Sequence, residues 1–477
     1  TIGADVHHDG IMFKPALDVS QGLMLFRDTF TQYGALTTII QAIAIKIFGE
    51  YLLVIRYTTA FFYALTSVLL YFIWQKILNR ALTFLSCIIW IFLAPYFVMT
   101  FLPWSSIYAL FFQCLTLYFY IYYLDQNKTK YLIFTGIGAG LTFWCKQNVG
   151  AYVLAAFIVS NIVFHYINKN SFKKTIQVII KFVYGTIIIS IPIFIWLIIN
   201  SALVDWWKQS IQYALFFIGS KSSISFINSL FPASISPVSI WSIMPIISLL
   251  ALLYEINQKK HNKNVIAISI FSLFSWLQYY PVTCLRHVYW ASTPMIGLVI
   301  YQLYKMSESF FLRNVIIRYI FLLLLTYLIF NIDITYRING GIANYNQNYV
   351  NLEYPTVLKG VKLAKTEADF YQKTYNEIID YKSKYGETYL ITTGPNALYA
   401  TFAKSQNFHK MYINWGIQLY PEYYLVKDQF IFNNQPLIYA IWEQTPGGYC
   451  KFDDTINPID TSYLVAPCNK INPKFKN

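Results

Sequence analysis

The sequence predicts a multi-pass α-helical membrane protein with a small α/β domain at its C-terminal end. Only 12% of the 477 residues are charged and 56% are hydrophobic, whereas a soluble domain has about a quarter charged residues. Aromatic residues make up 19% of the chain, and Tyr and Trp are typical of the membrane–water interface. The net charge of +14 comes from dispersed Lys and Arg, which argues against nucleic-acid binding and indicates topology signals.

About ten apolar runs are expected to form the spans. They lie at 51–75, 81–102, 104–124, 131–146, 149–167, 176–200, 238–256, 264–281, 288–305 and 313–332. Most are long enough to cross about 30 Å of hydrocarbon as a helix. The run at 131–146 is short and contains Gly136, Gly138 and Gly140, a spacing that lets two helices approach closely.

The connectors between these runs alternate in charge. One set contains Lys76 and Arg80, Lys128 and Lys130, Lys169, Lys173 and Lys174, Lys259, Lys260 and Lys263, and Lys305 and Arg313. The other set contains little beyond Lys146, Lys208, Lys221 and Arg286. The positive-inside rule makes the first set cytoplasmic, so both ends of the chain are expected outside.

Three regions follow from this topology. Residues 1–50 form an external catalytic loop, in which the short apolar run 35–49 is expected to lie at the membrane interface. Residues 51–332 form the transmembrane domain, interrupted by an external loop or lid at 201–237. Because the chain opens on Thr1 rather than Met, we expect a further span before it.

Residues 333–477 are expected to form an external soluble α/β domain. The segment 353–385 has a helical pattern, and the run PNALYATFAK is a second helix candidate. Strand-like runs occur at 388–393, 410–414, 436–442 and 462–467, and strands that alternate with helices suggest a small α/β fold. Cys450 and Cys468 both fall on the external side, where we expect them to form a disulfide.

Polar residues gather before the first predicted span. The richest group is Asp5, His7, His8 and Asp9. A carboxylate at the membrane surface can act as a general base on an acceptor hydroxyl, and a second carboxylate can orient it. The alternative is a solvated loop whose acids have no chemical role. We favour catalysis because acids, His, Gly and Arg occur together beside the membrane.

The same histidines raise the possibility of a metal site. His7 and His8, with Asp5 and Asp9, are residue types that bind divalent metals. Adjacent His side chains point in different directions on most backbones, so the spacing favours ordinary polar residues over a joint metal site.

Basic residues on the external side are candidates for holding a phosphate. Arg27 could bind a phosphate oxygen or pair with its neighbour Asp28. Lys146 could hold a lipid phosphate as a point charge or mark the membrane interface. Arg286, followed by His287, could clamp a phosphate or belong to an aromatic interfacial turn.

The external start of the chain contains Asp9, the segment GLMLFRD at 22–28 and the segment QYG at 32–34. Together they resemble the first external loop of GT-C glycosyltransferases, in particular the bacterial branch akin to protein O-mannosyltransferases and lipid A aminoarabinose transferase. FWCKQ at 143–147 also resembles bacterial members of that superfamily. The resemblance covers the span layout over most of 1–332.

The resemblance implies an inverting transfer of a sugar from a polyprenyl-phosphate donor in the bacterial inner membrane. It implies Asp9 as the catalytic base with Asp5 in reserve, Asp28 as a second acid, and Lys146 and Arg286 as phosphate ligands. Protein O-mannosyltransferases have Asp-Glu at the catalytic place, whereas this sequence has Asp9 followed by Gly10. The acceptor therefore stays open between a lipid-linked glycan, a polysaccharide and a protein.

Two other functions remain in competition. A transporter of lipid-linked sugars would place ionisable residues deep inside its spans, but Arg56, Lys181 and Arg318 lie near span ends. A non-catalytic assembly or glycan-binding protein would use the Tyr-rich segment 415–424 of the C-terminal domain.

Overall fold

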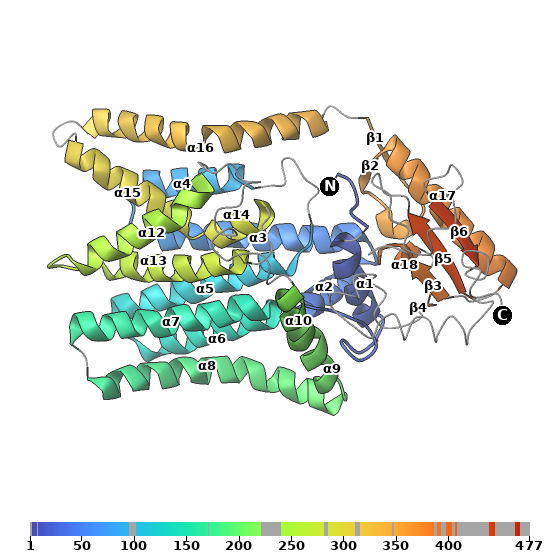
Figure 1. Cartoon of the computed structure of the whole chain (residues 1–477), viewed down its shortest axis with the longest axis horizontal. Coiled ribbons are helices and arrows are strands. Elements are labelled where there is room, and N and C mark those ends of the chain that lie inside the picture. Colours follow the sequence, from blue (N-terminus) through green and yellow to red (C-terminus); the bar gives the residue numbers. More distant parts are fainter. Residues whose placement is uncertain are drawn as a thin grey trace.

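A computed structural model describes most of the chain. The described residues are 2–6, 8–94, 102–169, 171–220, 240–280, 285–310, 315–345, 348–385, 389–392, 397–402, 406–407, 438–443 and 463–467. Long helices run side by side in a bundle, and a smaller unit of helices and strands covers one end of it (Figure 1). We call this covered end the domain end of the bundle.

The helices of residues 8–345 follow the chain order. They are α1 (His8–Ser20), α2 (Ala35–Phe48), α3 (Leu52–Trp74), α4 (Arg80–Phe92), α5 (Ser105–Gln126), α6 (Thr129–Cys145), α7 (Gln147–Asn168), α8 (Phe172–Ile199), α9 (Leu203–Trp207), α10 (Tyr213–Ser220), α12 (Ile240–Ile256), α13 (Lys263–Trp276), α14 (Leu285–Ser292), α15 (Met295–Phe310) and α16 (Val315–Tyr345).

The predicted class, an α-helical multi-pass membrane protein, is confirmed. Within the described residues, five helices are long and apolar enough to cross a membrane, namely α3, α5, α7, α8 and α16. Each expected span contains helix, but the run 288–305 is divided between α14 and α15. Pro294 lies in the turn between them, where its missing N–H interrupts helical hydrogen bonding.

Two segments expected to be loops are helical. Residues 8–20 form α1, because Ile11, Met12, Phe13, Ala16 and Leu17 are apolar residues that become buried. Residues 203–220, expected as part of a loop or lid, form α9, a π-helical turn and α10. The rest of that predicted lid, 221–237, lies outside the described residues.

The glycines of α6 allow the close helix packing that their spacing predicts. A Cβ atom on Gly136 would lie 1.9 Å from the backbone oxygen of Phe182 in α8, and one on Gly185 of α8 would lie 2.1 Å from the oxygen of Ile133. Both distances are far below a van der Waals contact, so the two backbones touch through glycine. Gly140 is less crowded, since its nearest atom would be 3.3 Å away.

We expect Gly136→Ala to destabilise the bundle by about 1–3 kcal/mol, because the added methyl group has to push α6 and α8 apart. Gly140→Ala is the matched control on the same helix, and its better helix propensity should keep its effect within about 1 kcal/mol. Thermal unfolding of the purified variants in detergent measures the difference. Equal melting temperatures for the two variants would contradict the packing described here.

The C-terminal unit has the expected α/β character. It contains β1 (Tyr349–Asn351), a 3₁₀ turn (Thr356–Leu358), β2 (Lys362–Ala364), α17 (Lys365–Tyr385), β3 (Tyr389–Thr392), α18 (Tyr399–Phe402), β4 (Gln406–Asn407), β5 (Ile438–Glu443) and β6 (Tyr463–Pro467). Strands β1 and β2 pair antiparallel. The larger sheet has the order β4-β3-β5-β6, in which only the β5–β6 pair is antiparallel.

Three predicted strands correspond to β3, β5 and β6. The predicted strand 410–414 and the predicted Cys450–Cys468 disulfide lie outside the described residues. Helix α16 continues to Tyr345, so the expected boundary after residue 332 falls inside a helix.

The start of the chain is bound to the C-terminal unit. The backbone N–H of Gly3 donates to the oxygen of Lys362 (2.8 Å), and that of Ala4 donates to Glu367 Oε1 (3.0 Å). One apolar core contains residues of α1, the start of α3, the segment 357–363, α17 and α18. The C-terminal unit therefore packs directly on α1 at the domain end of the bundle.

Candidate functional site

The first turn of α1 is held by two carboxylates that bond in opposite directions. Asp5 Oδ1 accepts the backbone N–H of His8 (2.8 Å), and Asp9 Oδ2 accepts the backbone N–H of Asp5 (2.8 Å). This reciprocal arrangement resembles a capping box, in which side chains satisfy the free donors of a helix start. Asp5 also lies 2.6 Å from His8 Nδ1, so it orients the imidazole.

Asp9 is paired with Arg56 of α3 in the protein interior. The Arg56 guanidinium contacts Asp9 Oδ2 at 2.5 Å and Asp9 Oδ1 at 3.2 Å, and both side chains are 0% exposed. Burial raises the pKa of Asp9 above its ordinary value, although Arg56 acts in the opposite direction. A carboxylate perturbed in this way is a candidate for proton transfer.

A further acid lies close to the same guanidinium. Glu367 of α17 accepts hydrogen bonds from the backbone of Ala4 (3.0 Å) and from the hydroxyl of Tyr371 (3.3 Å). Burial raises the pKa of Glu367, and the Arg56 charge lowers it in part. The C-terminal unit thus contributes a carboxyl group to the surroundings of the Asp9–Arg56 pair.

Gly10 lies where a side chain would clash with the C-terminal unit. A Cβ atom on Gly10 would lie 2.4 Å from the backbone nitrogen of Leu398 and 2.9 Å from the carbonyl carbon of Ala397. The backbone N–H of Leu398 also donates to the oxygen of Val6 (3.4 Å). Because the C-terminal unit fills the space beside α1, the second position of an Asp-Glu pair has no room for a side chain.

An aromatic cluster connects α1 with two other parts of the bundle. Trp104, which precedes α5, lies with its ring centroid 5.1 Å from that of His8 and 5.7 Å from that of His287. Tyr33 and Trp290 lie 6.4 and 5.7 Å from the same ring. His8 is the neighbour of Asp9, and His287 follows Arg286 in the first turn of α14. Two regions predicted as functional therefore meet at Trp104.

The indole of Trp104 offers a hydrogen-bond donor. Its Nε1 is buried and has no hydrogen-bond partner within the part of the chain that the structure describes. A buried donor without a partner costs free energy, which a ligand could recover by accepting its hydrogen bond. By contrast, Trp290 Nε1 donates to the hydroxyl of Tyr63 (2.8 Å).

Lys146 lies near this cluster at the domain end of the bundle. Its ammonium donates to Ser106 Oγ (2.8 Å), and Ser106 comes two residues after Trp104. Cys145, which precedes Lys146, contacts the segment QYG: the backbone N–H of Gly34 donates to the oxygen of Cys145 (3.2 Å). The segments QYG and FWCKQ are therefore in direct contact.

Arg27 and Asp28 lie at the other end of α1. They pair with each other (2.7 Å), and Asp28 Oδ2 accepts the backbone N–H of Met24 (2.8 Å). The next residue, Thr29, donates to Asp18 Oδ2 (2.7 Å) near the C-terminal end of α1. Asp18 is nine residues after Asp9, which is about 13 Å along a helix. The structure groups Asp5, His8 and Asp9 but places Arg27 and Asp28 apart from them.

The suggested metal site concerns His7 and His8. His7 lies outside the described residues, and His8 contacts Asp5 and Trp104. Among the residues described, no group of three or more His, Cys, Asp or Glu side chains is arranged to hold a metal ion.

Three residues of this region were not chosen from the sequence as site residues. The sequence places Arg56 near the end of a span, although a charged residue inside an apolar run usually has a buried partner. Trp104 begins an apolar run and Glu367 lies in a charged segment with a helical pattern, so neither stands out as a site residue. Nothing in the local sequence relates Glu367 to a residue more than 300 positions away.

Comparisons with known proteins find similarity in part of the sequence and in the fold. Residues 35–196 match a family model described as dolichyl-phosphate-mannose-protein mannosyltransferase. A search among curated proteins finds no match. The structure of ArnT from Cupriavidus metallidurans bound to undecaprenyl phosphate is similar, with a TM-score of 0.56 and 10% identity, over 93% of this chain and 89% of that one.

The oligosaccharyltransferase of Archaeoglobus fulgidus is also similar. Its apo form has a TM-score of 0.55 and 12% identity, over 91% of this chain and 65% of that one. The same enzyme tethered to an acceptor peptide with an NVT sequon has a TM-score of 0.52 and 11% identity, over 92% and 65% of the two chains. This chain therefore spans less than two thirds of the oligosaccharyltransferase.

Proposed function

We propose that this chain, a multi-pass membrane protein with the fold of the GT-C glycosyltransferases, transfers a sugar from a polyprenyl-phosphate donor to an acceptor. The resemblance to GT-C enzymes expected from the sequence is confirmed by the family model and the solved structures. Two observations support this class of donor. The description of the family model includes dolichyl-phosphate-mannose, and the similar structure of ArnT is bound to undecaprenyl phosphate.

The observation that carries this proposal is the meeting of α1, the start of α5 and α14 at Trp104. His8, which precedes Asp9, and His287, which follows Arg286, lie beside the ring of Trp104. The indole N–H of Trp104 has no partner among the described residues. Ligand sites of this kind combine apolar and aromatic walls with a few polar groups that orient the ligand. A sugar can pack on the rings while its hydroxyl groups reach the polar atoms.

The proposed reaction is a displacement at the anomeric carbon. The acceptor nucleophile forms a bond to this carbon while the bond to the phosphate oxygen breaks, and the configuration inverts. Asp9 takes the proton of the acceptor, and polyprenyl phosphate leaves with the electron pair. For this step the acceptor has to displace one of the hydrogen bonds that Asp9 accepts from Arg56 and Asp5.

Lys146 and Arg286 are the proposed ligands of the phosphate. Both lie at the domain end of the bundle, and cationic groups aimed at a leaving phosphate lower the barrier to its departure. Lys146 is held by Ser106, and Arg286 begins α14 beside His287. The contacts of Arg27 with Asp28 favour a role in shaping the turn over phosphate binding.

We propose that the domain end faces the outside of a bacterial plasma membrane. The turns after α7 and α12 and the start of α16 lie at the opposite end of the bundle (Figure 1). These turns contain the Lys-rich connectors 169–174 and 259–263, which the positive-inside rule assigns to the cytoplasm. A lipid donor suits the external side because its phosphate stays at the interface while the sugar reaches α1.

Turnover of a polyprenyl-phosphate sugar by the full chain in proteoliposomes tests the proposal. We expect release of polyprenyl phosphate in the presence of cell-envelope acceptors. Trp104→Phe should lower turnover by about tenfold, since it removes one buried donor and keeps an aromatic ring. Trp241→Phe is the matched control outside the cluster, because the Nε1 of this buried indole already donates to Asp333 Oδ1 (3.0 Å). Absence of turnover with every polyprenyl-phosphate sugar tried would reject the donor class.

A further inference from the structure

A cavity of about 410 Å³ lies at the end of the bundle opposite α1. Its walls come from the last turns of α5 and α7, the first turns of α8 and the segment from His261 to Lys263 before and within α13. These elements meet far from the Trp104 cluster, because they are the opposite ends of the same long helices (Figure 1). The cavity therefore has no part in the proposed sugar transfer.

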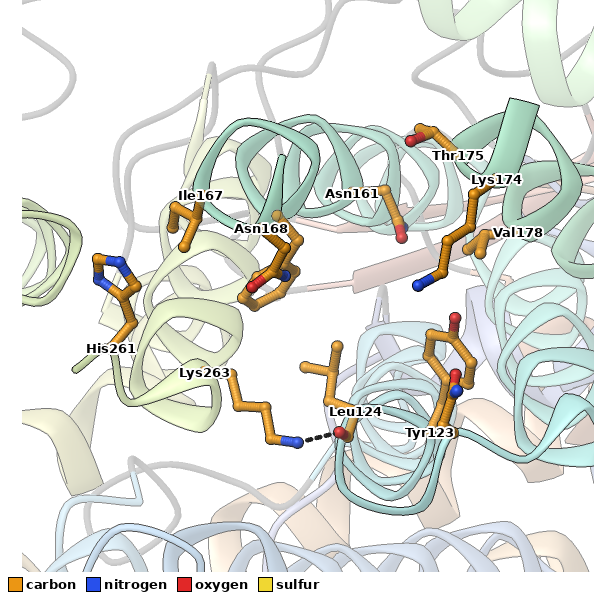
Figure 2. Close-up of a pocket in the computed structure, with 12 residues that line it drawn as sticks. Tyr123, Leu124, Asn161, Ile167, Asn168, Lys174, Thr175, Val178, His261 and Lys263 are labelled. Atoms are coloured by element: carbon orange, nitrogen blue, oxygen red, sulfur yellow. Dashed lines mark hydrogen bonds between the residues drawn. The ribbon is translucent and has the colours of Figure 1, made fainter. Parts of the chain in front are cut away.

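The polar part of the cavity wall is positively charged. Lys174 and Lys263 line it, and no Asp or Glu is among the lining residues. Figure 2 shows the ammonium of Lys174 directed into the cavity between Asn161 and Tyr123, and the ammonium of Lys263 on the backbone oxygen of Leu124. Two cations thus flank the cavity from different sides, whereas the amide nitrogen of Asn161 donates to the backbone oxygen of Phe157 (2.7 Å).

Two helices begin at this cavity. Helix α8 begins after Ser171, which caps it by accepting the N–H of Lys174 (3.3 Å). Helix α13 begins after Asn262, whose side chain accepts the N–H of Asn264 and Val265. The partial positive charge of a helix start favours an anion. The last turns of α5 and α7 bring the partial negative charge of two helix ends to the same cavity, so its positive charge comes from the two lysines.

Asp125 and Glu255, which belong to the ends of α5 and α12, have other partners. Asp125 accepts from Lys76 (2.9 Å) and from the side chain of Asn264 (3.3 Å). Glu255 is 4% exposed and accepts the hydroxyl of Tyr301 (3.0 Å) and the backbone N–H of Asn262 (3.0 Å). Neither carboxylate lines the cavity, so the positive field reaches its interior.

Apolar side chains lie among the polar groups in the cavity wall (Figure 2). Phe164, Ile167, Val178 and Leu124 line the cavity, and Phe164 is 7% exposed. A ligand that fits both kinds of side chain has an anionic group next to a hydrocarbon part. Basic pockets between transmembrane helices on the cytoplasmic side bind the head groups of anionic lipids in this way.

We propose that this cavity is a binding site for the phosphate group of an anionic membrane phospholipid. The phosphate contacts Lys174 and Lys263, and the first carbons of the acyl chains pack on Phe164 and Ile167. The bound lipid contacts α5, α7, α8 and α13 at the end of the bundle where these four helices pack together. Occupancy of the site stabilises the bundle at the end remote from the sugar-transfer site.

The test titrates the purified full chain in detergent with phosphatidylglycerol, phosphatidylcholine or inorganic phosphate, and follows binding by native mass spectrometry and thermal unfolding. We expect retained phosphatidylglycerol and a raised melting temperature. The double variant Lys174→Gln with Lys263→Gln should raise the dissociation constant by about 30-fold, because each lysine contributes about 1 kcal/mol of attraction to an anionic lipid. The matched control is Lys259→Gln with Lys260→Gln, which removes two exposed lysines beside the cavity and should change binding less than twofold.

Three results would overturn the proposal. Equal loss in the two double variants would mean that the lysines act only as general surface charge. Equal binding of phosphatidylcholine would remove the requirement for an anionic lipid. Binding of inorganic phosphate without binding of phosphatidylglycerol would keep the phosphate site and reject the lipid as its source. All four lysines are exposed, so loss of folding is not expected in either variant.

Discussion

Asp9→Asn is expected to reduce the rate of sugar transfer by about 10²–10⁴-fold, the range that a general base contributes. The amide keeps the size of the side chain and can still accept hydrogen bonds from Arg56 and from the backbone of Asp5. It cannot take a proton from an acceptor. Donor binding should change little, because the proposed phosphate ligands are Lys146 and Arg286. The measurement is single-turnover transfer together with the dissociation constant of the donor.

Loss of folding has to be separated from loss of the base. Asp9→Asn leaves the guanidinium of Arg56 buried without an opposite charge on Asp9, which is destabilising. The double variant Asp9→Asn with Arg56→Met removes this cost and should recover most of the melting temperature while transfer stays low. Near-normal transfer by Asp9→Asn would exclude Asp9 as the base and leave it the role of a structural ion pair.

Arg56→Met alone should have the largest effect on stability. It leaves the Asp9 carboxylate buried without its partner, and breaking a buried ion pair from one side costs about 3–5 kcal/mol. Burial already raises the pKa of Asp9, and Arg56 is the main group that lowers it. Without the guanidinium the pKa of Asp9 therefore moves further up, and the carboxyl group can avoid the cost by binding a proton.

This shift gives the Arg56→Met variant a defined pH dependence. A folded-state pKa above the unfolded value means that the folded protein binds the proton more tightly, so stability rises as the pH falls between the two values. The deficit relative to the wild type should be largest at neutral pH and shrink on acidification. Urea unfolding between pH 7 and pH 5 measures this. Since burial also raises the pKa of Glu367, the double variant with Asp9→Asn identifies the carboxyl group responsible.

The transmembrane part of the structure is readable from the sequence because hydrocarbon imposes a simple rule. Apolar runs of sufficient length become helices, and the glycines of α6 indicate close packing, as Gly136 shows. The elements at the domain end depend instead on contacts between distant parts of the chain. Helix α1 carries apolar residues that are buried against a unit encoded more than 300 residues later, and no local pattern reveals that unit.

The candidate site likewise combines residues that the sequence indicates with contacts that only the tertiary fold reveals. The sequence indicates Asp9 by its position before the first span and by its similarity to known motifs, and both features concern residues close together in sequence. Its ion pair depends on Arg56, 47 positions away, and its cover depends on residues 397–398. The space available at Gly10 depends on the same cover. Charge, burial and access at the site are therefore properties of the tertiary fold.

The attachment of residues 2–6 to the C-terminal unit has a consequence for biosynthesis. The surroundings of Asp9 include Glu367, Ala397 and Leu398, which leave the ribosome after all the helices of the bundle. A nascent chain can thus insert its helices while the first turn of α1 still lacks its cover. The order of synthesis keeps the proposed centre incomplete until the last third of the chain has folded onto the first ten residues.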